Sequence, residues 1–296
     1  MTTGDLHNGT SAVTVILTLL MILVVGVGIV LGWQNHRSYI YSIGREIAKY
    51  GTLVQTYHLS YLKGDHFVVK YYPGDKEQAT LALEAAENFV GPIAEKLGYI
   101  PEQEVTIVVY PTREKLNNYF GWPADESAMG VYWAGTIRVL APREWINTDN
   151  AADMREIFFS SGPMAHEIAH LAVDYRTRGN YTRWFTEGIA QYIELELTGF
   201  RFKDPAGTLD QQRYSIEQLT NQFDQLPNQS LAYRQSLAAT YYLVAVYGEG
   251  VLTEILDELM SGATMDQALQ RTCDVDLKNF ENQLNKWLDN NWHVLS

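Results

Sequence analysis

Cysteine is almost absent from this 296-residue chain, which contains only Cys273. A single cysteine cannot form an internal disulfide, and it has no partner for a zinc site built from cysteine pairs. A zinc site of the cysteine type is therefore excluded. Cys273 itself falls in a helical pattern, where a small side chain packs against neighbouring helices.

Basic residues are also scarce, since 22 Lys and Arg stand against 35 Asp and Glu, a formal net charge of −13. All 22 basic residues follow position 35, together with 34 acidic ones (35 less Asp5), so that part alone carries −12. An acidic surface of this kind repels nucleic acid and anionic lipid. We therefore exclude nucleic acid as a partner.

The amino terminus lacks Lys and Arg altogether but holds a long apolar run. Residues 12–33 are nearly all Val, Ile, Leu, Met and Gly. As a helix rising 1.5 Å per residue they would span roughly 33 Å, enough to cross a bilayer. A cleaved signal peptide has a shorter apolar region, about 7 to 15 residues, preceded by basic residues. We predict a short tail at 1–11 and an uncleaved transmembrane helix at 12–33 in contact with the lipid bilayer.

Histidine is rare too, yet two of the 7 His residues stand four apart in the segment HEIAH at 166–170. Two imidazoles at this spacing on a helix point the same way and can hold one metal ion. Glu167 between them can act as a general base. Apolar residues recur every three or four positions through 154–175, but Pro163 interrupts them. Either one helix runs through, or a new helix begins at Pro163; the pair keeps its geometry in both cases.

A catalytic zinc ion usually takes three protein ligands and keeps a fourth position for water. A second helical pattern begins near Thr182 and contains Glu187 among apolar and aromatic residues. An isolated helical Glu is usually solvated, but Gly188 permits close approach of two backbones here. A carboxylate buried in such a place would be neutralised by a metal. Glu187 is therefore the candidate third ligand.

The segments HEIAH at 166–170 and WFTEGIAQY at 184–192 together resemble the gluzincin zinc metallopeptidases, most closely the peptidase-MA-like bacterial proteins. The resemblance extends over about residues 67–292. It implies that His166, His170 and Glu187 bind one Zn²⁺ ion and that Glu167 polarises a water molecule. It also implies a peptide or protein substrate.

Peptide hydrolysis needs a donor to the developing oxyanion besides the metal. Gluzincins commonly supply it as a Tyr or His downstream of the third ligand, and only His293 follows His170 in this chain. A Tyr is therefore favoured. Tyr233 is the first candidate because AYRQS at 232–236 is similar to a Tyr-x-Gln-Ser element of the family. Tyr241 and Tyr242 are the alternatives.

Residues that orient the imidazoles through their other ring nitrogens are expected around the metal ligands. Asp174 follows His170 by four positions on the same helix face, and we prefer it to Gln191 and Glu194. Its alternative role is a surface carboxylate at the end of the helix.

The segment before the zinc motif predicts a hairpin, with strands at 130–133 and 136–140 joined by two residues. In gluzincins a strand at this position borders the cleft and pairs with an extended peptide. Gly130, Tyr132 and Trp133 are therefore candidates for the substrate groove. Aminopeptidase members carry Gly-x-Met-Glu-Asn there, and the Glu binds the substrate amine. This chain has SAMG at 127–130 instead, which favours an endopeptidase.

The order of elements predicts an α+β fold, with strands first and helices later. Strands are expected at 67–72 and 105–110, a helix at 76–97 between them, and helices from the zinc motif onward. We expect a juxtamembrane connector at 34–62, a zincin-like catalytic lobe with a small mixed or antiparallel sheet and the active-site helices at 63–200, and a helical lobe at 201–296.

These patterns predict a membrane-anchored zinc metallopeptidase. One alternative is a catalytically idle binding module, although the chain keeps all three ligands and Glu167. Another is a zinc hydrolase of a non-peptide cell-wall bond. Basic residues after the span favour a cytoplasmic catalytic domain. Large domains translocate regardless of nearby charge, however, and related anchored proteins are often outside the cell. We expect a single-pass protein of the cell membrane with its catalytic domain on the extracytoplasmic side.

Overall fold

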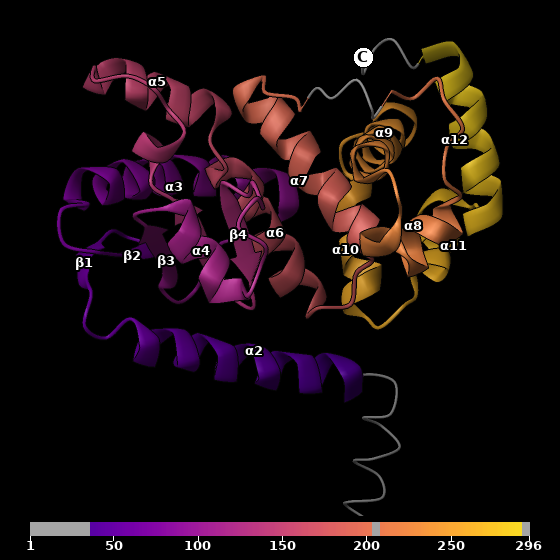
Figure 1. Ribbon diagram of the computed structural model, residues 1–296. Helices are drawn as coiled ribbons and strands as arrows, with labels where there is room; N and C mark the ends of the chain where they lie inside the picture. Colours follow the sequence, from indigo (N-terminus) through magenta and orange to yellow (C-terminus); the bar gives the residue numbers. More distant parts are fainter. Residues whose placement is uncertain (1–35, 203–207, 292–296) are drawn as a thin grey trace, which may run out of the picture.

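The computed structural model describes residues 36–202 and 208–291 (Figure 1). The predicted tail at 1–11 and the predicted transmembrane helix at 12–33 lie outside these residues. Within the described ranges, no helix is both long enough and apolar enough to cross a bilayer. The predicted anchor therefore stays a prediction.

A five-stranded mixed sheet organises the first half of the chain, with strand order β1-β2-β3-β5-β4. The central pairs β2 with β3 and β3 with β5 are parallel, and the two edge pairs are antiparallel. This arrangement confirms the predicted small mixed sheet. The strands are β1 (Ser60–Lys63), β2 (Phe67–Tyr71), β3 (Val105–Tyr110), β4 (Gly130–Trp133) and β5 (Thr136–Leu140).

The β4–β5 hairpin confirms the predicted turn and places β4 at an edge of the sheet. Its two connecting residues, Ala134 and Gly135, have φ values of 46° and 80°. Two positive φ angles in succession define a type I′ turn, whose twist matches that of a two-residue hairpin. Among the described strands β4 pairs with β5 alone, and on its other edge Tyr132 N–H donates to Glu167.

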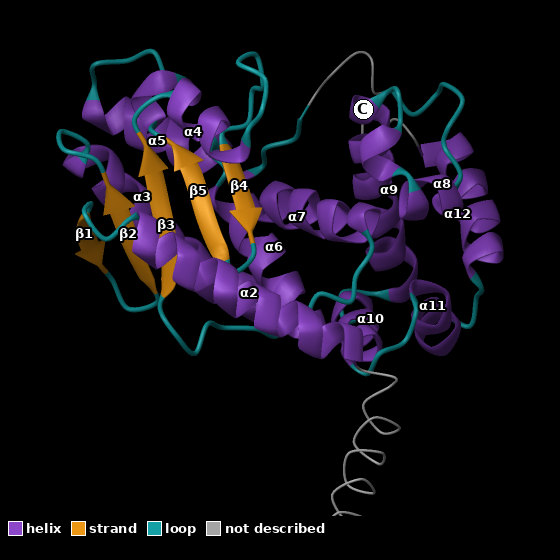
Figure 2. Cartoon of the chain, turned by 60° about the horizontal axis from the view of Figure 1, so that its bottom comes forward, coloured by secondary structure: helices purple, strands orange, loops and turns teal. Residues whose placement is uncertain are grey.

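Helices cover both faces of the sheet (Figure 2). On one face lie α3 (Lys76–Leu97) and the zinc-motif helix α6 (Met164–Thr177), packed on apolar side chains of β2, β3 and β5. Gly98 ends α3 in the left-handed conformation, with φ 67°. On the other face lie α2 (His36–Gln55) and α4 (Arg113–Phe120).

A break at Pro163 separates α5 (Ala151–Ser161) from α6 and decides between the two alternatives for this region. Proline has no backbone N–H and clashes with the preceding turn, so the upstream helix cannot continue through it. The carbonyl of Pro163 accepts from Glu167 N at 2.9 Å, and α6 starts within this turn. Both histidines therefore belong to one short helix that starts just before them.

The second half of the described chain is helical, as predicted. One buried apolar cluster contains side chains of both predicted lobes, so the sheet part and the helical part share a core. The helices are α7 (Arg183–Thr198), α8 (Ile216–Asn221), α9 (Gln229–Tyr247), α10 (Val251–Met260), α11 (Met265–Cys273) and α12 (Leu277–Asn291).

The segment 34–62, expected to be a connector, instead belongs to the folded body where it is described. Strand β1 pairs with β2 through Ser60 to Lys63, and α2 lies across one face of the sheet (Figure 2). Three of the four residues of β1 are exposed, so buried and exposed side chains do not alternate along it. The short sequence SYLK therefore gives little indication of a strand.

Candidate metal centre

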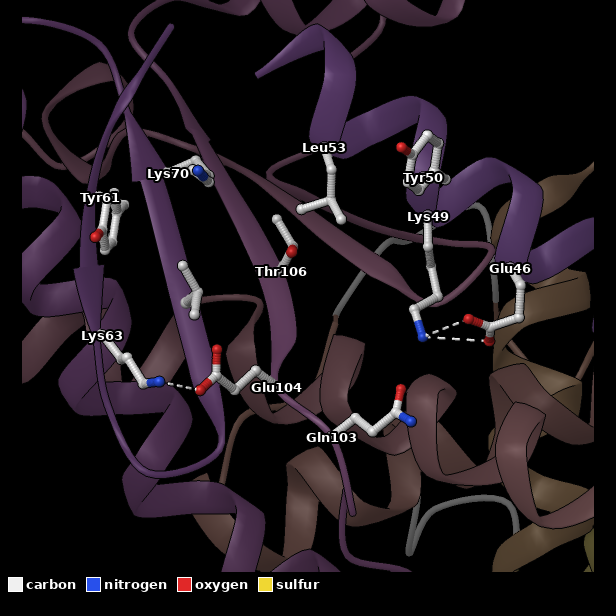
Figure 3. A pocket seen from close by; sticks show the side chains of 11 residues that line it. Glu46, Lys49, Tyr50, Leu53, Tyr61, Lys63, Lys70, Gln103, Glu104 and Thr106 are labelled. Atoms are coloured by element: carbon white, nitrogen blue, oxygen red, sulfur yellow. Dashed lines mark hydrogen bonds and ion pairs between the residues drawn. The ribbon is translucent and has the colours of Figure 1, made fainter. Parts of the chain in front are cut away.

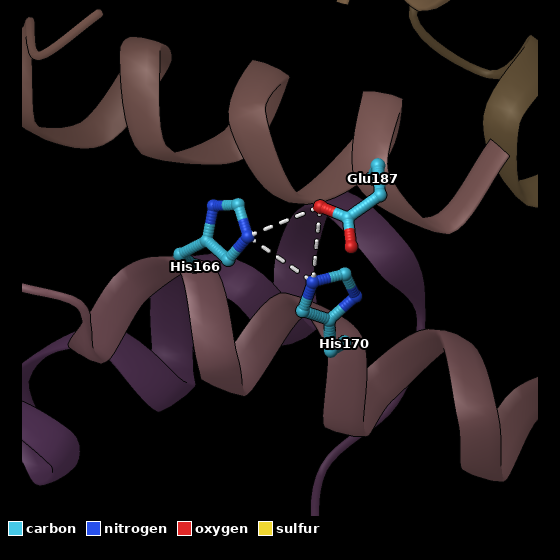
Figure 4. Close-up of side chains that lie close together, drawn as sticks. All are labelled: His166, His170 and Glu187. Atoms are coloured by element: carbon cyan, nitrogen blue, oxygen red, sulfur yellow. Dashed lines mark hydrogen bonds and ion pairs between the residues drawn. The ribbon is translucent and has the colours of Figure 1, made fainter. Parts of the chain in front are cut away.

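The zinc-motif helix α6 and the helix α7 bring three side chains together (Figure 4). The Nε2 atoms of His166 and His170 lie 3.1 Å apart, and each lies 3.5 Å from Glu187 Oε2. Four ligands at 2.0–2.1 Å from a tetrahedral zinc ion stand about 3.3 Å from one another. The three atoms therefore have the spacing of three corners of such a site.

Glu187 has the environment expected of a ligand. Its side chain is 3% exposed, and Oε2 is buried without a hydrogen-bond partner among the described residues. The other oxygen, Oε1, lies 3.0 Å from Arg183 Nη2. Burial raises the pKa of Glu187, but the charges of His170 and Arg183 outweigh it and hold the pKa well below its ordinary value. The carboxylate is thus ionised, with one free oxygen directed at both imidazoles.

The outer nitrogens of the imidazoles contact α7. His170 Nδ1 lies 2.7 Å from Thr186 Oγ1, and His166 Nδ1 lies 3.3 Å from Glu194 Oε2. With Nε2 directed at a metal, Nδ1 carries the proton and donates, which fixes the tautomer and the ring orientation. Thr186 and Glu194 therefore orient the two imidazoles.

The prediction that Asp174 orients an imidazole is wrong. Asp174 is fully buried, but its Oδ2 binds Arg45 Nη1 of α2 at 3.0 Å and the hydroxyl of Tyr132. A four-residue step along α6 moves the carboxylate one turn past His170, while the ring of His170 turns towards α7. The outer nitrogen of His170 therefore meets Thr186 of α7 and not Asp174.

Glu167 is buried beside the ligands and bonded to the edge strand. The backbone N–H of Tyr132 in β4 donates to Glu167 Oε2 at 2.5 Å. Burial raises the pKa of Glu167, and the neighbouring His166 and His170 only partly oppose this shift. A raised pKa makes a carboxylate a better proton acceptor, as a general base requires.

The predicted groove residues take different positions on β4. A Cβ on Gly130 would lie 2.5 Å from Pro163 Cβ and 2.9 Å from Glu167 Oε1, so only glycine fits there. The Tyr132 hydroxyl donates to the carboxylate of Asp174 on α6. Trp133 is 56% exposed and its ring contacts Phe120. Gly130 is thus beside the Glu167 carboxylate, whereas the rings of Tyr132 and Trp133 contact other groups.

The backbone of β4 nevertheless presents a free edge at the site. Leu140 N donates to Met129 O at 2.8 Å, so Met129 and Leu140 form a hydrogen-bonded pair of the antiparallel ladder. Bonded pairs alternate in an antiparallel ladder, so Gly130 and Tyr132 direct their N–H and C=O groups away from β5. One of these groups, Tyr132 N–H, binds Glu167.

Tyr233 lies on α9 at the border of the site. Its hydroxyl is 3.5 Å from Arg183 Nη2, the same atom that binds Glu187. The charge of Glu187, together with burial, raises the pKa of Tyr233, so the phenol stays protonated and can donate. The alternatives have other partners, since the Tyr241 ring contacts Trp287 and the Tyr242 hydroxyl binds Gln283.

Two residues of the site were missing from the sequence-based prediction. Arg183 stands one helical turn before Glu187, a spacing at which a cation commonly pairs with a carboxylate. Thr186 directly precedes the third ligand, but nothing in its sequence position shows that its hydroxyl meets an imidazole from another helix.

Comparison with known proteins defines the family. A sequence model of the Peptidase MA superfamily matches residues 85–290, a range that includes all three candidate ligands. The chain belongs to this superfamily, which confirms the resemblance seen in its motifs and makes it a member of a family of peptidase-type hydrolases. Among the curated proteins compared, none matches the chain.

Two solved structures are similar to the chain at 13% sequence identity. One is a mutant of a two-domain M1 zinc metallopeptidase bound to L-arginine, with a TM-score of 0.40, covering 77% of this chain. The other is a mutant of an M1 zinc metallopeptidase from Deinococcus radiodurans, with a TM-score of 0.41, covering 78%. The match spans 51% of each of those proteins, so this chain corresponds to about half their length.

Proposed function

We propose that this protein is a zinc-dependent metallopeptidase that cleaves internal peptide bonds. The observation that carries the proposal is the spacing of 3.1–3.5 Å between the ligand atoms of His166, His170 and Glu187. The buried free oxygen of Glu187 supports it, because a buried ionised oxygen without a hydrogen bond is costly unless a cation neutralises it. Zinc bound there would polarise the substrate carbonyl and lower the pKa of a bound water.

The proton transfers fall to Glu167. Its carboxylate takes a proton from the attacking water and returns it to the departing amine. The bond from Tyr132 N holds Oε2 in place, which leaves Oε1, beside Gly130, to face the reacting groups. Tyr233 donates its phenolic hydrogen to the developing oxyanion from the side of Arg183.

Strand β4 supplies the binding surface for the peptide. The outward C=O and N–H groups of Gly130 and the C=O of Tyr132 can pair with an extended chain, as an added strand does. No acidic side chain occurs at 127–133, where aminopeptidases of the gluzincin type hold the substrate amine. A free amino terminus is therefore not required for binding, and an endopeptidase is favoured.

We further propose that residues 12–33 anchor this peptidase in the cell membrane with the catalytic domain on the extracytoplasmic side. The support for the anchor is the sequence, since no charged residue interrupts 8–35. The extracytoplasmic side is proposed because large domains translocate regardless of nearby charge. Proteolysis of right-side-out membrane vesicles tests the orientation. An added protease digests an extracytoplasmic domain in intact vesicles, whereas it digests a cytoplasmic domain only after the vesicles are opened.

The test of the catalytic proposal compares Glu167→Gln with wild type for bound zinc and for cleavage of a peptide library. We expect unchanged zinc and a fall in cleavage of about 10²- to 10⁴-fold. The matched control is Glu156→Gln, an exposed glutamate of α5, which should keep full activity. Equal activity of the Glu167 variant and wild type would refute the proposed base.

Peptides with acetylated amino termini separate the two classes of peptidase. An endopeptidase cleaves acetylated and free peptides at similar rates, because neither carries a group that the site must bind. Loss of cleavage on acetylation would show an aminopeptidase instead. Binding of zinc without cleavage of any peptide would favour the idle module or a hydrolase of another bond.

A further inference from the structure

Helix α2 turns its apolar side to the outside of the molecule. Side chains at three- and four-residue spacing form a stripe along it, and each is between 57% and 70% exposed. We call this the α2 stripe: Tyr39, Ile40, Ile43, Ile47, Tyr50 and Val54. At 100° per residue all six fall within one arc of about 100° around the helix. No charged residue of α2 falls within this arc.

The opposite side of α2, which faces the protein, is polar where it is buried. Among the described side chains of α2 the buried ones are Arg45 and Thr52. Arg45 binds Asp174 of α6, and Thr52 Oγ1 accepts from Arg138 Nη2 of β5 at 2.7 Å. A helix on the surface of a water-soluble domain has the reverse arrangement, with its apolar side on the core. The outward stripe therefore indicates an apolar environment outside the domain.

The position of α2 fits a flat surface. It lies along one side of the molecule, and the sheet and the remaining labelled helices lie on its other side (Figure 1). Its 20 residues give a length of about 30 Å. The apolar run 12–33 ends three residues before α2 begins at His36. If that run crosses a bilayer, α2 starts at the bilayer surface.

The chemistry of the stripe suits the boundary between headgroups and acyl chains. Two of its six side chains are tyrosines, which favour this boundary because a ring and a hydroxyl suit its apolar and wet sides. Amphipathic helices lie there with their apolar side buried to a depth of about 5–10 Å.

Charge contributes little to this surface. A hollow of about 470 Å³ separates α2 from the outer face of the sheet, and three lysines line it (Figure 3). Lys49 is paired with Glu46 and Lys63 with Glu104. Lys70 lies over the ring of Tyr61 at 5.0 Å. With two of the three cations paired and an acidic chain behind them, an anionic headgroup gains little here.

We propose that the α2 stripe lies in the surface of the lipid bilayer and holds the catalytic domain against it in one orientation. Arg45 and Asp174 join α2 to the zinc-motif helix, so the metal centre keeps a fixed position relative to the bilayer. The attraction comes from burial of apolar side chains, and it is independent of the headgroup charge. The proposal rests on the proposed membrane anchor at 12–33 and does not require peptidase activity.

The test places a fluorophore on the full-length chain in phosphatidylcholine vesicles. In a Cys273→Ser background, Ile47→Cys reports on the stripe. Val246→Cys on α9 is the matched control, since that valine is 50% exposed and outside α2. We expect lipids brominated on the acyl chains to quench the label at 47 several-fold more than the label at 246. Added phosphatidylglycerol or high salt should leave the difference unchanged.

A second variant shows whether quenching at 47 depends on the whole stripe or only on the label itself. Replacing Ile43 and Val54 by Ser should reduce quenching at 47 while zinc content and circular dichroism stay unchanged, because neither side chain is buried in the domain. Equal quenching at 47 and 246, or failure of the chain to enter vesicles, would overturn the proposal. Energy transfer between labels at 47 of two copies would show that a second copy covers the stripe, which also overturns it.

Discussion

The guanidinium of Arg45 lies 3.0 Å from the carboxylate of Asp174, and the two residues are 129 positions apart in the sequence. The pair joins α2 to the helix that carries both histidines. The same carboxylate binds the hydroxyl of Tyr132, whose backbone N–H holds Glu167. One buried anion thus connects the helix beside the predicted membrane anchor, the edge strand and, through Tyr132, the proposed base Glu167.

Removing this anion should destabilise the fold. Asp174→Ala leaves Arg45 buried without its partner, and loss of one member of a buried pair costs about 3–5 kcal/mol. Urea unfolding measures this loss. The matched control is Asp289→Ala, which breaks the pair of Arg213 with a carboxylate 65% exposed and should cost less than about 1 kcal/mol. Similar losses in both variants would contradict a special role for the buried pair.

Glu194 should set the zinc affinity through His166. Glu194→Gln replaces the acceptor of the Nδ1 proton by a weaker one, and such changes typically lower metal affinity by about 10- to 100-fold. Competition with a chelator measures the affinity. Glu196→Gln, two positions further along α7, contacts Lys96 and should leave zinc binding unchanged. An unchanged affinity in the Glu194 variant would remove this residue from the set that orients the ligands.

Gly188 should be required for the packing of the third-ligand helix. A Cβ there would lie 2.3 Å from both Ser236 O and Thr240 Oγ1 of α9, so α7 and α9 must separate in Gly188→Ala. Overpacking of this kind costs about 1–3 kcal/mol. It should also displace Glu187 and weaken zinc binding.

A second helical glycine controls for the change in helix propensity. A Cβ on Gly91 in α3 meets nothing within 4 Å, so Gly91→Ala should be neutral or stabilise by up to about 1 kcal/mol. Thermal unfolding of both variants separates the two effects. If both alanines act alike, the close approach of α7 and α9 is not what Gly188 provides.

Tyr233 should act in the reaction and not in metal binding. Tyr233→Phe removes the donor to the oxyanion while keeping the ring, and loss of one such donor lowers kcat by about 10²- to 10³-fold. Zinc content should be unchanged. Tyr242→Phe, which loses the bond to Gln283, is the control and should keep wild-type kcat. A fall in both variants, or in neither, would argue against this assignment.

Glu87 should make stability depend on pH. Burial raises the pKa of its carboxyl, but hydrogen bonds from His66 and Phe67 outweigh this, and the net shift is downward. A lowered folded-state pKa adds stability above the ordinary value of 4.5 that is lost as the pH falls through the folded-state pKa. Glu87→Gln should therefore cost about 1 kcal/mol at neutral pH and nothing in strong acid.

Unfolding measured at both pH values checks this dependence. Glu95→Gln on the exposed side of α3 is the matched control and should show no such change with pH. A cost of Glu87→Gln that stays constant into strong acid would show that ionisation of the carboxyl is not its source.

Much of the fold could be predicted because its signals are local. The helix at 76–97 and the strands at 105–110, 130–133 and 136–140 have the predicted bounds, since periodicity and turn residues lie within each segment. The strand at 60–63 could not be predicted, because its four residues owe their conformation to pairing with β2. Gly135 is a local signal for the turn because glycine readily adopts a positive φ, whereas β1 has no such local signal.

The sequence by itself determined the candidate ligands and the base. A four-residue step on a helix aligns His166 with His170, Glu167 stands between them, and the pattern at 184–192 points to Glu187. Only the tertiary structure decided what orients these ligands. Asp174 has the right spacing from His170, but α2 brings Arg45 to it, and α7 brings Thr186 and Glu194 to the imidazoles. Helical spacing fixes contacts within one helix, while contacts between helices depend on how their faces pack. For the same reason, the apolar residues of α2 give a helical pattern in the sequence, and the packing of the whole domain decides that they face outward.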